Sequence, residues 1–371
     1  MAFGSQSPKG IASANAKCQR STIDAKEAGS APFMAGRRHH HIWQMLQRGF
    51  ASREHGEHHV WVYRKDCAAK RTVTRKFGQD SYFYGPEGSA ADLNITDFEN
   101  RVQSHIQDAR AAEDGTKVDS DIWAAIVSHL EMRSLFMREI MSQIPERFAK
   151  AIAGYLQSPE IREQIMTAYL RNPENVETLA SEIGLPAEQI SLFLDAPGAL
   201  PALIAGGAND LADNALPFLS FLQEILPKKM KQTHNQALER DFAFSERADS
   251  HALLKYTVRQ YDDGPLILPD TTLAFFSRKG CRPTWRRDDR IDAVVVPIST
   301  STAVVGCVHG NFVRDAETIR RALASCAYQA FLAKDLTEAN SRLSRRISTN
   351  ARLYSDVEYR RATSLEHFLK L

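Results

Sequence analysis

Histidine is concentrated in one stretch near the start of the chain. The segment from Arg37 to Lys65 holds half of the chain's 12 histidines, namely His39, His40, His41, His55, His58 and His59. Imidazole suits zinc and other transition metals, and carboxylates with water suit magnesium or manganese. The stretch is therefore the first candidate for metal chemistry. On a helix, His39, His40 and His41 would point about 100° apart, so they could not all face one ion.

The same stretch predicts a short helix, a turn and a hairpin. Ile42, Met45, Leu46 and Phe50 recur at helical spacing. After the turn, HVWVYRK and KRTVTRKF read as two strands, and both are rich in arginine and lysine. These charges could hold a phosphate partner. They are explained equally well as protection of an exposed edge against sheet-to-sheet aggregation.

Helices are predicted in the middle of the chain. Thr96 and Glu99 have capping-box spacing and predict a helix start, and Glu99 could serve only as that cap. The apolar stripe behind the cap is Phe98, Val102, Ile106 and Ala109. A second helix is predicted from Asp121 to about Ile144, with Arg133 and Ser134 in its middle.

Further helix starts carry a proline after a capping residue. Ser158-Pro159 and Asn172-Pro173 both fit this pattern. The segment ETLASEIGLPAEQISLFL has the spacing of a helix-turn-helix. Its acidic surroundings would repel phosphate, so a structural helical hairpin is favoured over DNA recognition.

Strand signals return after PKKMKQ at 227–232. ALLKYTVRQY, LILPDTTLAFF, AVVVPIST and TAVVGCV are β-branched runs between turn residues. Asp270 stands at one of these turns, where carboxylates often cap the chain. The loop RKGCRPTWRRDDR at 278–290 places Trp285 among arginines, which could stack a base and hold phosphates, or could simply be solvated. From Ala316, ETIRRALASCAYQAFLAKD predicts a helix.

The charge is divided unevenly along the 371 residues, although the net charge is only +2. Residues 1–90 carry 14 basic and 7 acidic residues, so +7. Residues 91–225 carry 9 and 21, so −12, and residues 226–371 carry 24 and 17, so +7. The basic ends could neutralise the acidic block, or they could form a face that attracts an anion such as nucleic acid.

Several classes of protein are disfavoured. No apolar run approaches the roughly 20 residues of a membrane helix, and no signal peptide opens the chain. The five scattered cysteines fit a reducing cytosol better than a disulfide framework, so we expect a cytoplasmic protein. Neither a GxSxG elbow, a Walker loop nor a Rossmann glycine fingerprint occurs.

RRHHHIWQMLQRGF followed by VWVYRK resembles the opening motif of the domain-of-unknown-function 4238 family. The resemblance places the family's histidine on His40 and its helix glutamate on Glu99. Its arginine helix matches Arg133-Ser134, and its aspartate turn matches Asp270 in LPDTTLAF. Trp43 stands where the family motif has proline. No established activity comes with the resemblance.

These four residues together suggest phosphodiester chemistry. His40, Glu99 and Asp270 could bind a divalent metal that polarises a phosphoryl oxygen and activates water. Arg133 could then stabilise the developing phosphate charge. We therefore predict a metal-assisted, nuclease-like phosphodiester hydrolase, with His40, Glu99, Arg133 and Asp270 as catalytic residues.

The alternative is a non-enzymatic module that binds nucleic acid or protein. Arg133 would then pair with Glu99 inside the fold, and His40 would be structural. The nucleic-acid contacts predicted from the basic hairpin and loop are Arg64, Lys65, Arg71, Arg75, Trp285, Arg286 and Arg287.

The chain as a whole predicts an α+β fold. We expect a disordered leader at 1–36 and a basic α+β core formed by 37–110 and 230–334. An acidic helical insertion is expected at 111–229, and a polar, peripheral tail at 335–371.

Overall fold

The computed structural model describes residues 38–85, 88–239, 246–285, 290–309 and 312–353. The predicted leader lies outside these ranges. The described chain divides into two compact units, unit 1 with residues 38–138 and 235–352, and unit 2 with residues 139–234. The first boundary falls later than the predicted position 111, because helix α3 (Ser120–Met132) packs against α9 (Glu246–Ala252) and β6 (Lys255–Gln260) of unit 1.

The strands of the described residues all belong to unit 1. They are β1 (Arg38–His40), β2 (Ser52–Glu54), β3 (Glu57–Arg64), β4 (Lys70–Val73), β5 (Gln79–Ser81), β6, β7 (Leu268–Pro269), β8 (Ala274–Ser277), β9 (Gly280–Arg282), β10 (Ala293–Pro297), β11 (Thr302–Cys307) and β12 (Ala330–Ala333). Its helices, besides α3 and α9, are α1 (Gln44–Arg48), α2 (Ala90–Ala111), α10 (Ala316–Cys326) and α11 (Glu338–Leu343).

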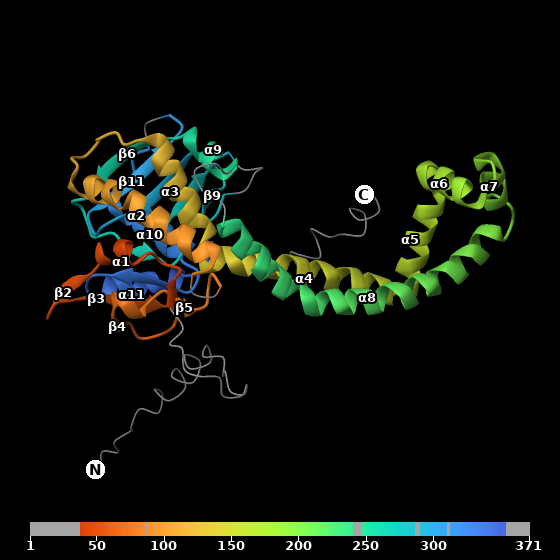
Figure 1. Ribbon diagram of the computed structural model, residues 1–371, viewed down its shortest axis with the longest axis horizontal. Coiled ribbons are helices and arrows are strands. Elements are labelled where there is room, and N and C mark those ends of the chain that lie inside the picture. Colours follow the sequence, from red (N-terminus) through yellow and green to blue (C-terminus); the bar gives the residue numbers. More distant parts are fainter. Residues whose placement is uncertain (1–37, 86–87, 240–245, 286–289, 310–311, 354–371) are drawn as a thin grey trace, which may run out of the picture. The chain divides into compact units, whose positions relative to one another are not determined.

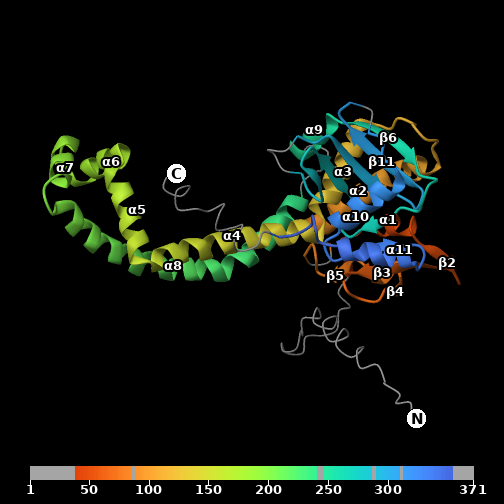
Figure 2. The same cartoon turned by 180° about the vertical axis from the view of Figure 1, so that it is seen from behind.

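Antiparallel sheets organise unit 1. One sheet has the order β6-β11-β10-β8-β9, and a second has the order β2-β3-β12-β7 with β4 also paired to β3. Strands β1 and β5 form a small third sheet. Helices α2 and α3 lie in front of the first sheet in Figure 1, whereas α10 lies in front of it in the opposite view of Figure 2. The fold is therefore α+β, as the sequence predicts.

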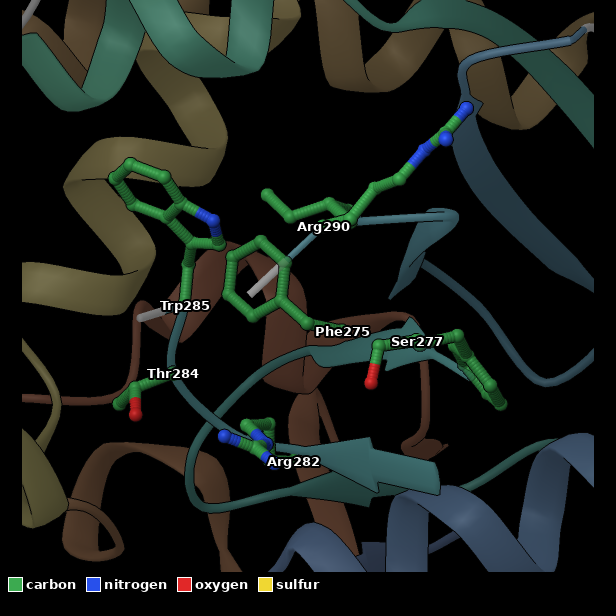
Figure 3. Close-up of a pocket in the computed structure, with 8 residues that line it drawn as sticks. Phe275, Ser277, Arg282, Thr284, Trp285 and Arg290 are labelled. Atoms are coloured by element: carbon green, nitrogen blue, oxygen red, sulfur yellow. The ribbon is translucent and has the colours of Figure 1, made fainter. Parts of the chain in front are cut away.

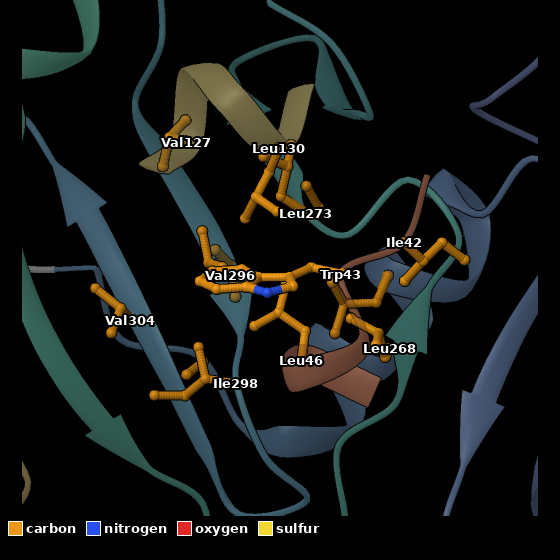
Figure 4. Packing of buried hydrophobic residues seen from close by; sticks show 14 of the residues in the cluster. Ile42, Trp43, Leu46, Val127, Leu130, Leu268, Leu273, Val296, Ile298 and Val304 are labelled. Carbon is orange, nitrogen blue, oxygen red and sulfur yellow. The ribbon is translucent and has the colours of Figure 1, made fainter. Parts of the chain in front are cut away.

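The main hydrophobic core fills the space between these layers. Trp43, at the position where the resembling family has proline, packs beside Leu130 of α3, Leu273 and Val296 of β10 (Figure 4). The indole is almost fully buried. Because a large aromatic side chain removes so much apolar surface from water, Trp43 contributes strongly to holding α1 against α3 and the sheet.

Unit 2 is helical. It contains most of α4 (Leu135–Gln157) and α8 (Ala199–Leu238), together with α5 (Pro159–Arg171), α6 (Pro173–Ile183) and α7 (Ala187–Leu194). The proline-headed starts of α5 and α6 are confirmed, with Ser158 and Asn172 capping them. Gly184 ends α6 in the left-handed conformation at φ 76°, and a small cluster around Val176 and Ile190 joins α6 to α7.

The first two histidines of the His39–His41 triplet lie on a strand rather than on the predicted helix. His39 and His40 belong to β1, where they pair with Asp80 and Gln79 of β5. The helix begins only at Gln44. A strand partner forty residues away outweighs the local helical spacing, and it makes neighbouring histidine rings point to opposite sides.

Helix α2 begins at Ala90 instead of Thr96. Ser89 caps it by accepting the Asp92 backbone N–H, and the Asp92 carboxylate in turn accepts the Gly88 N–H at 3.2 Å. This reciprocal cap precedes the capping-box spacing of Thr96 and Glu99, which therefore lie inside the helix. The predicted stripe from Phe98 to Ala109 is buried, as expected.

The predicted helix from Asp121 to Ile144 is two helices. It breaks at Arg133 and Ser134, because the Ser134 hydroxyl accepts the Met137 N–H and starts α4 anew. The predicted helix from Ala316 also ends early, and Phe331 lies on β12 between β3 and β7.

The segment after β12 is partly integrated into the core. Leu343, Ile347 and Ala351 are buried, so the described part of the predicted peripheral tail packs against unit 1. Cys281, Cys307 and Cys326 are free thiols.

Within the described ranges, no single helix has the length and apolar character needed to cross a membrane. The bent pair formed by α7 and α8 meets the same test when its two helices are taken together.

Candidate functional site

Arg133 is the centre of a buried polar cluster between α2, α3 and β1. Its side chain is enclosed, with 1% of the residue exposed. Nε donates to the Tyr84 hydroxyl at 3.0 Å, Nη1 donates to the Glu99 carboxylate, and Nη2 donates to the His40 backbone carbonyl. Nη1 also lies 3.0 Å from Nε2 of His129. Every guanidinium nitrogen therefore has a protein partner.

The electrostatics of this cluster keep Arg133 charged and His129 neutral. Burial opposes the charge of Arg133, but Glu99 and Tyr84 together raise its pKa above the ordinary value. Burial, with the nearby guanidinium, holds the pKa of His129 well below its usual range. The neutral His129 ring stacks on Phe98, with ring centroids 4.4 Å apart. The arrangement fits a structural ion pair that fastens α3 to α2.

The three histidines of the triplet have different surroundings. His39 accepts the Tyr84 N–H on Nδ1 at 3.0 Å and stacks on the Tyr84 ring. His41 packs on Phe83, and burial together with the charge of Arg133 lowers its pKa to about 3. Burial and the same arginine lower the pKa of the half-buried His40.

Asp270 holds a turn. Its carboxylate accepts three backbone N–H groups, from Tyr328 at 2.7 Å, Gln329 at 2.6 Å and Ala330 at 2.9 Å. Burial raises its pKa to about 6, although the three amides act in the opposite direction. Asp270 lies at a turn, as its place between apolar segments predicts, but its carboxylate connects the end of α10 to the start of β12 instead of capping its own turn.

The structure brings His40, Glu99 and Arg133 together, but through the His40 carbonyl rather than its ring. Asp270 is bonded to a different segment. In the part of the chain that the structure describes, no group of three or more His, Cys, Asp or Glu side chains could hold a metal ion. The predicted ligands therefore do not form a metal site among these residues.

A second buried carboxylate, Glu131, was not singled out by the sequence. It is fully buried and accepts from Arg247 Nη1 at 2.6 Å and from the Trp285 backbone N–H at 2.8 Å. Nε2 of His251 lies 3.4 Å from its other oxygen. The sequence feature that could have identified Glu131 is its position within the otherwise apolar helix SDIWAAIVSHLEM. This group links α3, α9 and the segment after β9.

That segment forms one wall of a small, shallow recess with about 10 Å³ of free space (Figure 3). Phe275 and Phe276 come from β8, Arg282 comes from β9, and Trp285 and Arg290 also line the recess. The half-buried Trp285 ring stands beside Phe275, while Arg282 lies below both. The guanidinium of Arg247 is 5.9 Å from the Trp285 ring.

The predicted basic hairpin is partly neutralised. Arg71 pairs with Glu54, and Arg75 Nη2 lies 2.8 Å from Glu57 Oε1. The guanidinium of Arg64 stands 6.0 Å from the Phe77 ring centre, and Lys65 is exposed. The predicted contacts Arg286 and Arg287 lie outside the described residues. Of the predicted nucleic-acid contacts, Trp285 alone lines the recess within the described ranges.

Comparisons with known proteins give no relative. No family model, curated protein or solved structure matches the chain. The resemblance to the domain-of-unknown-function 4238 family therefore stays a prediction.

The low pKa of His41 should make the protein less stable in mild acid. The folded-state pKa of about 3 lies below the ordinary 6.5, so the unfolded state binds the proton first as the pH falls. Between about pH 6.5 and 5, this costs about 2 kcal/mol of the free energy of unfolding. We expect His41→Asn to reduce the loss between pH 7 and 5 by about that amount in urea titrations.

His55→Asn is the matched control, because His55 is exposed and its positive φ of 48° suits asparagine. If the free energy of unfolding depends on pH equally in the wild type and in His41→Asn, the loss of stability in mild acid does not come from His41.

Proposed function

We propose that this chain binds single-stranded nucleic acid at the recess formed by β8, β9 and the segment around Trp285. The supporting observation is the combination of a half-buried indole, the half-buried ring of Phe276 and two arginines around one recess, with the buried Phe275 beneath them. Bases stack on aromatic rings whatever their sequence, and arginine attracts the phosphate backbone. The proposal corresponds to the binding-module alternative rather than to the hydrolase.

The Trp285 platform is held in place before any ligand arrives. Its backbone N–H donates to buried Glu131, and the His251 ring meets its indole edge-on with centroids 5.9 Å apart. A ring that is already ordered loses little conformational entropy when a base stacks on it. The free space inside the recess is only about 10 Å³, so a base would stack on its aromatic rim rather than enter it.

The metal-assisted hydrolase ranks below this proposal. Arg133, which was to stabilise phosphate charge, is enclosed and bonded to Tyr84, Glu99 and His40. The carboxylate of Asp270 is occupied by three amides. Neither side chain is placed to meet a substrate.

For the compartment, we propose the cytoplasm. The free thiols of Cys281, Cys307 and Cys326 support it. Fractionation of cells that produce this chain distinguishes the cytoplasm from an oxidising compartment.

Binding to labelled single-stranded oligonucleotides tests the function. Fluorescence anisotropy with oligo-dT and oligo-rA should give affinities that fall steeply with salt. Trp285→Ala should weaken binding about tenfold or more, because one base–aromatic stack is worth about 1–3 kcal/mol, and Trp285→Phe should retain most of it. Arg282→Gln should lower the salt slope by about one unit.

Arg53→Gln is the control for charge, since Arg53 is an exposed arginine on β2, in the other sheet. The proposal fails if Trp285→Ala binds as tightly as the wild type, or if the affinity is the same at low and high salt.

A further inference from the structure

Two free cysteines face each other behind the edge strand β9. Cys281 lies on β9, and Cys326 is the last residue of α10. The Cys281 thiol contacts the Ala322 carbonyl at 4.0 Å, one helical turn before Cys326, and residues four apart share one face of a helix. The thiol of Cys326 is hydrogen-bonded to Cys281.

The two sulfurs have unequal surroundings. Cys281 is half-buried and accepts a hydrogen bond from Asn350 Nδ2 at 3.1 Å, whereas Cys326 is fully buried. The hydrogen bond from Cys326 lowers the pKa of Cys281 to about 7, and Asn350 and the charge of Arg346 act in the same direction against burial. Burial raises the pKa of Cys326 well above its usual range. A reachable thiolate therefore stands next to an enclosed thiol.

We propose that Cys281 is a site of reversible oxidation by hydroperoxides, and that Cys326 resolves the oxidised sulfur as an intramolecular disulfide. In the first step the Cys281 thiolate attacks the peroxide, so that an S–O bond forms and the O–O bond breaks. The products are a sulfenic acid on Cys281 and an alcohol, or water when the oxidant is hydrogen peroxide. The peroxide is reduced, and the sulfur is oxidised.

In the second step Cys326 attacks the sulfenic sulfur. The S–S bond forms, the S–O bond breaks, and the hydroxyl leaves as water with the proton of the Cys326 thiol. In sum, two thiols and one hydroperoxide give one disulfide, one alcohol and one water. A dithiol reductant restores both thiols by thiol–disulfide exchange and becomes a disulfide itself.

The position of β9 suits this reaction. The strand is three residues long and, in the described sheet, stands at the edge with β8 as its partner. A short edge strand can adjust to the geometry that a disulfide needs more readily than a central one. The reacting side chain is not one that lines the recess, since Cys281 contacts α10.

Peptide mapping by mass spectrometry tests the proposal on the full-length protein. After treatment with one equivalent of hydrogen peroxide and alkylation in denaturant, the peptides of Cys281 and Cys326 should be joined with the loss of two hydrogens. Dithiothreitol should separate them. In the native, untreated protein near pH 7, iodoacetamide should modify Cys281 about tenfold faster than buried Cys307.

Variants separate the two roles. Cys326→Ser should leave a sulfenic acid on Cys281 that a dimedone probe traps, and Cys281→Ser should give neither the disulfide nor the trapped product. Cys307→Ser, at another buried cysteine, should form the same disulfide as the wild type.

The peptide map of the wild-type protein does not depend on any variant, so the test remains valid even if a variant does not fold. Unmodified Cys281 after peroxide treatment would overturn the oxidation site. Sulfinic acid on Cys281 without the link to Cys326 would overturn the resolving role.

Discussion

Arg133→Met should lower the free energy of unfolding by about 3–5 kcal/mol, because it removes the buried charged donor that a partly buried carboxylate and three other polar groups share. The partners are the Glu99 carboxylate, the Tyr84 hydroxyl, the His40 carbonyl and the neutral His129 ring. A lysine cannot reach all of them with one ammonium group, so Arg133→Lys should recover only a small part. Urea unfolding followed by circular dichroism measures the loss.

Arg101→Met is the matched control on the surface. Arg101 pairs with Asp97 one turn away on α2 at 3.2 Å, and both side chains are largely exposed. Such a pair is worth about 0.3–0.5 kcal/mol, so the control should stay close to the wild type. The double variant Arg133→Met with Glu99→Met should be more stable than Arg133→Met alone, since the unpaired carboxylate is gone. An Arg133→Met protein within 1 kcal/mol of the wild type would contradict this account.

Glu131→Ala should be about as damaging and should also affect the recess. The fully buried carboxylate holds Arg247, the Trp285 backbone and the neighbouring His251, and its loss removes the one acceptor that joins them. We expect Glu131→Ala to lower the free energy of unfolding by about 3–5 kcal/mol. Glu131→Gln should cause a smaller loss, because it keeps a hydrogen-bond acceptor. Glu131→Gln should still weaken oligonucleotide binding, because the Trp285 segment loses its charged anchor.

The control is Glu338→Ala, which removes an exposed carboxylate paired with Arg342 at 2.8 Å. It should change neither stability nor binding measurably. Thermal melting and anisotropy on the same samples separate the two effects of Glu131. If Glu131→Ala melts with the wild type, the carboxylate is not the anchor that its contacts indicate.

Local patterns in the sequence predicted the elements whose signals lie within one turn or one strand. The buried stripe of α2, the capped starts of α5 and α6, and the β-branched runs of β6, β10 and β11 all follow from residues close together in the chain. Capping, periodicity and turn chemistry act over a few residues, so one sequence suffices to read them. Trp285 was likewise singled out because of its arginine neighbours, and its role stays a prediction.

Only the tertiary structure decided the elements and contacts that depend on distant partners. His39 and His40 lie on strand β1 because β5 pairs with them. Phe331 lies on strand β12 because β3 and β7 pair with that segment on either side. The structural role of Glu131 depends on its contacts with Arg247 and Trp285, which lie more than a hundred positions away in the sequence. The sequence by itself indicated a role for the polar residues Arg133, Glu99 and Asp270. Burial and long-range hydrogen bonds, which no local pattern contains, made them parts of the scaffold.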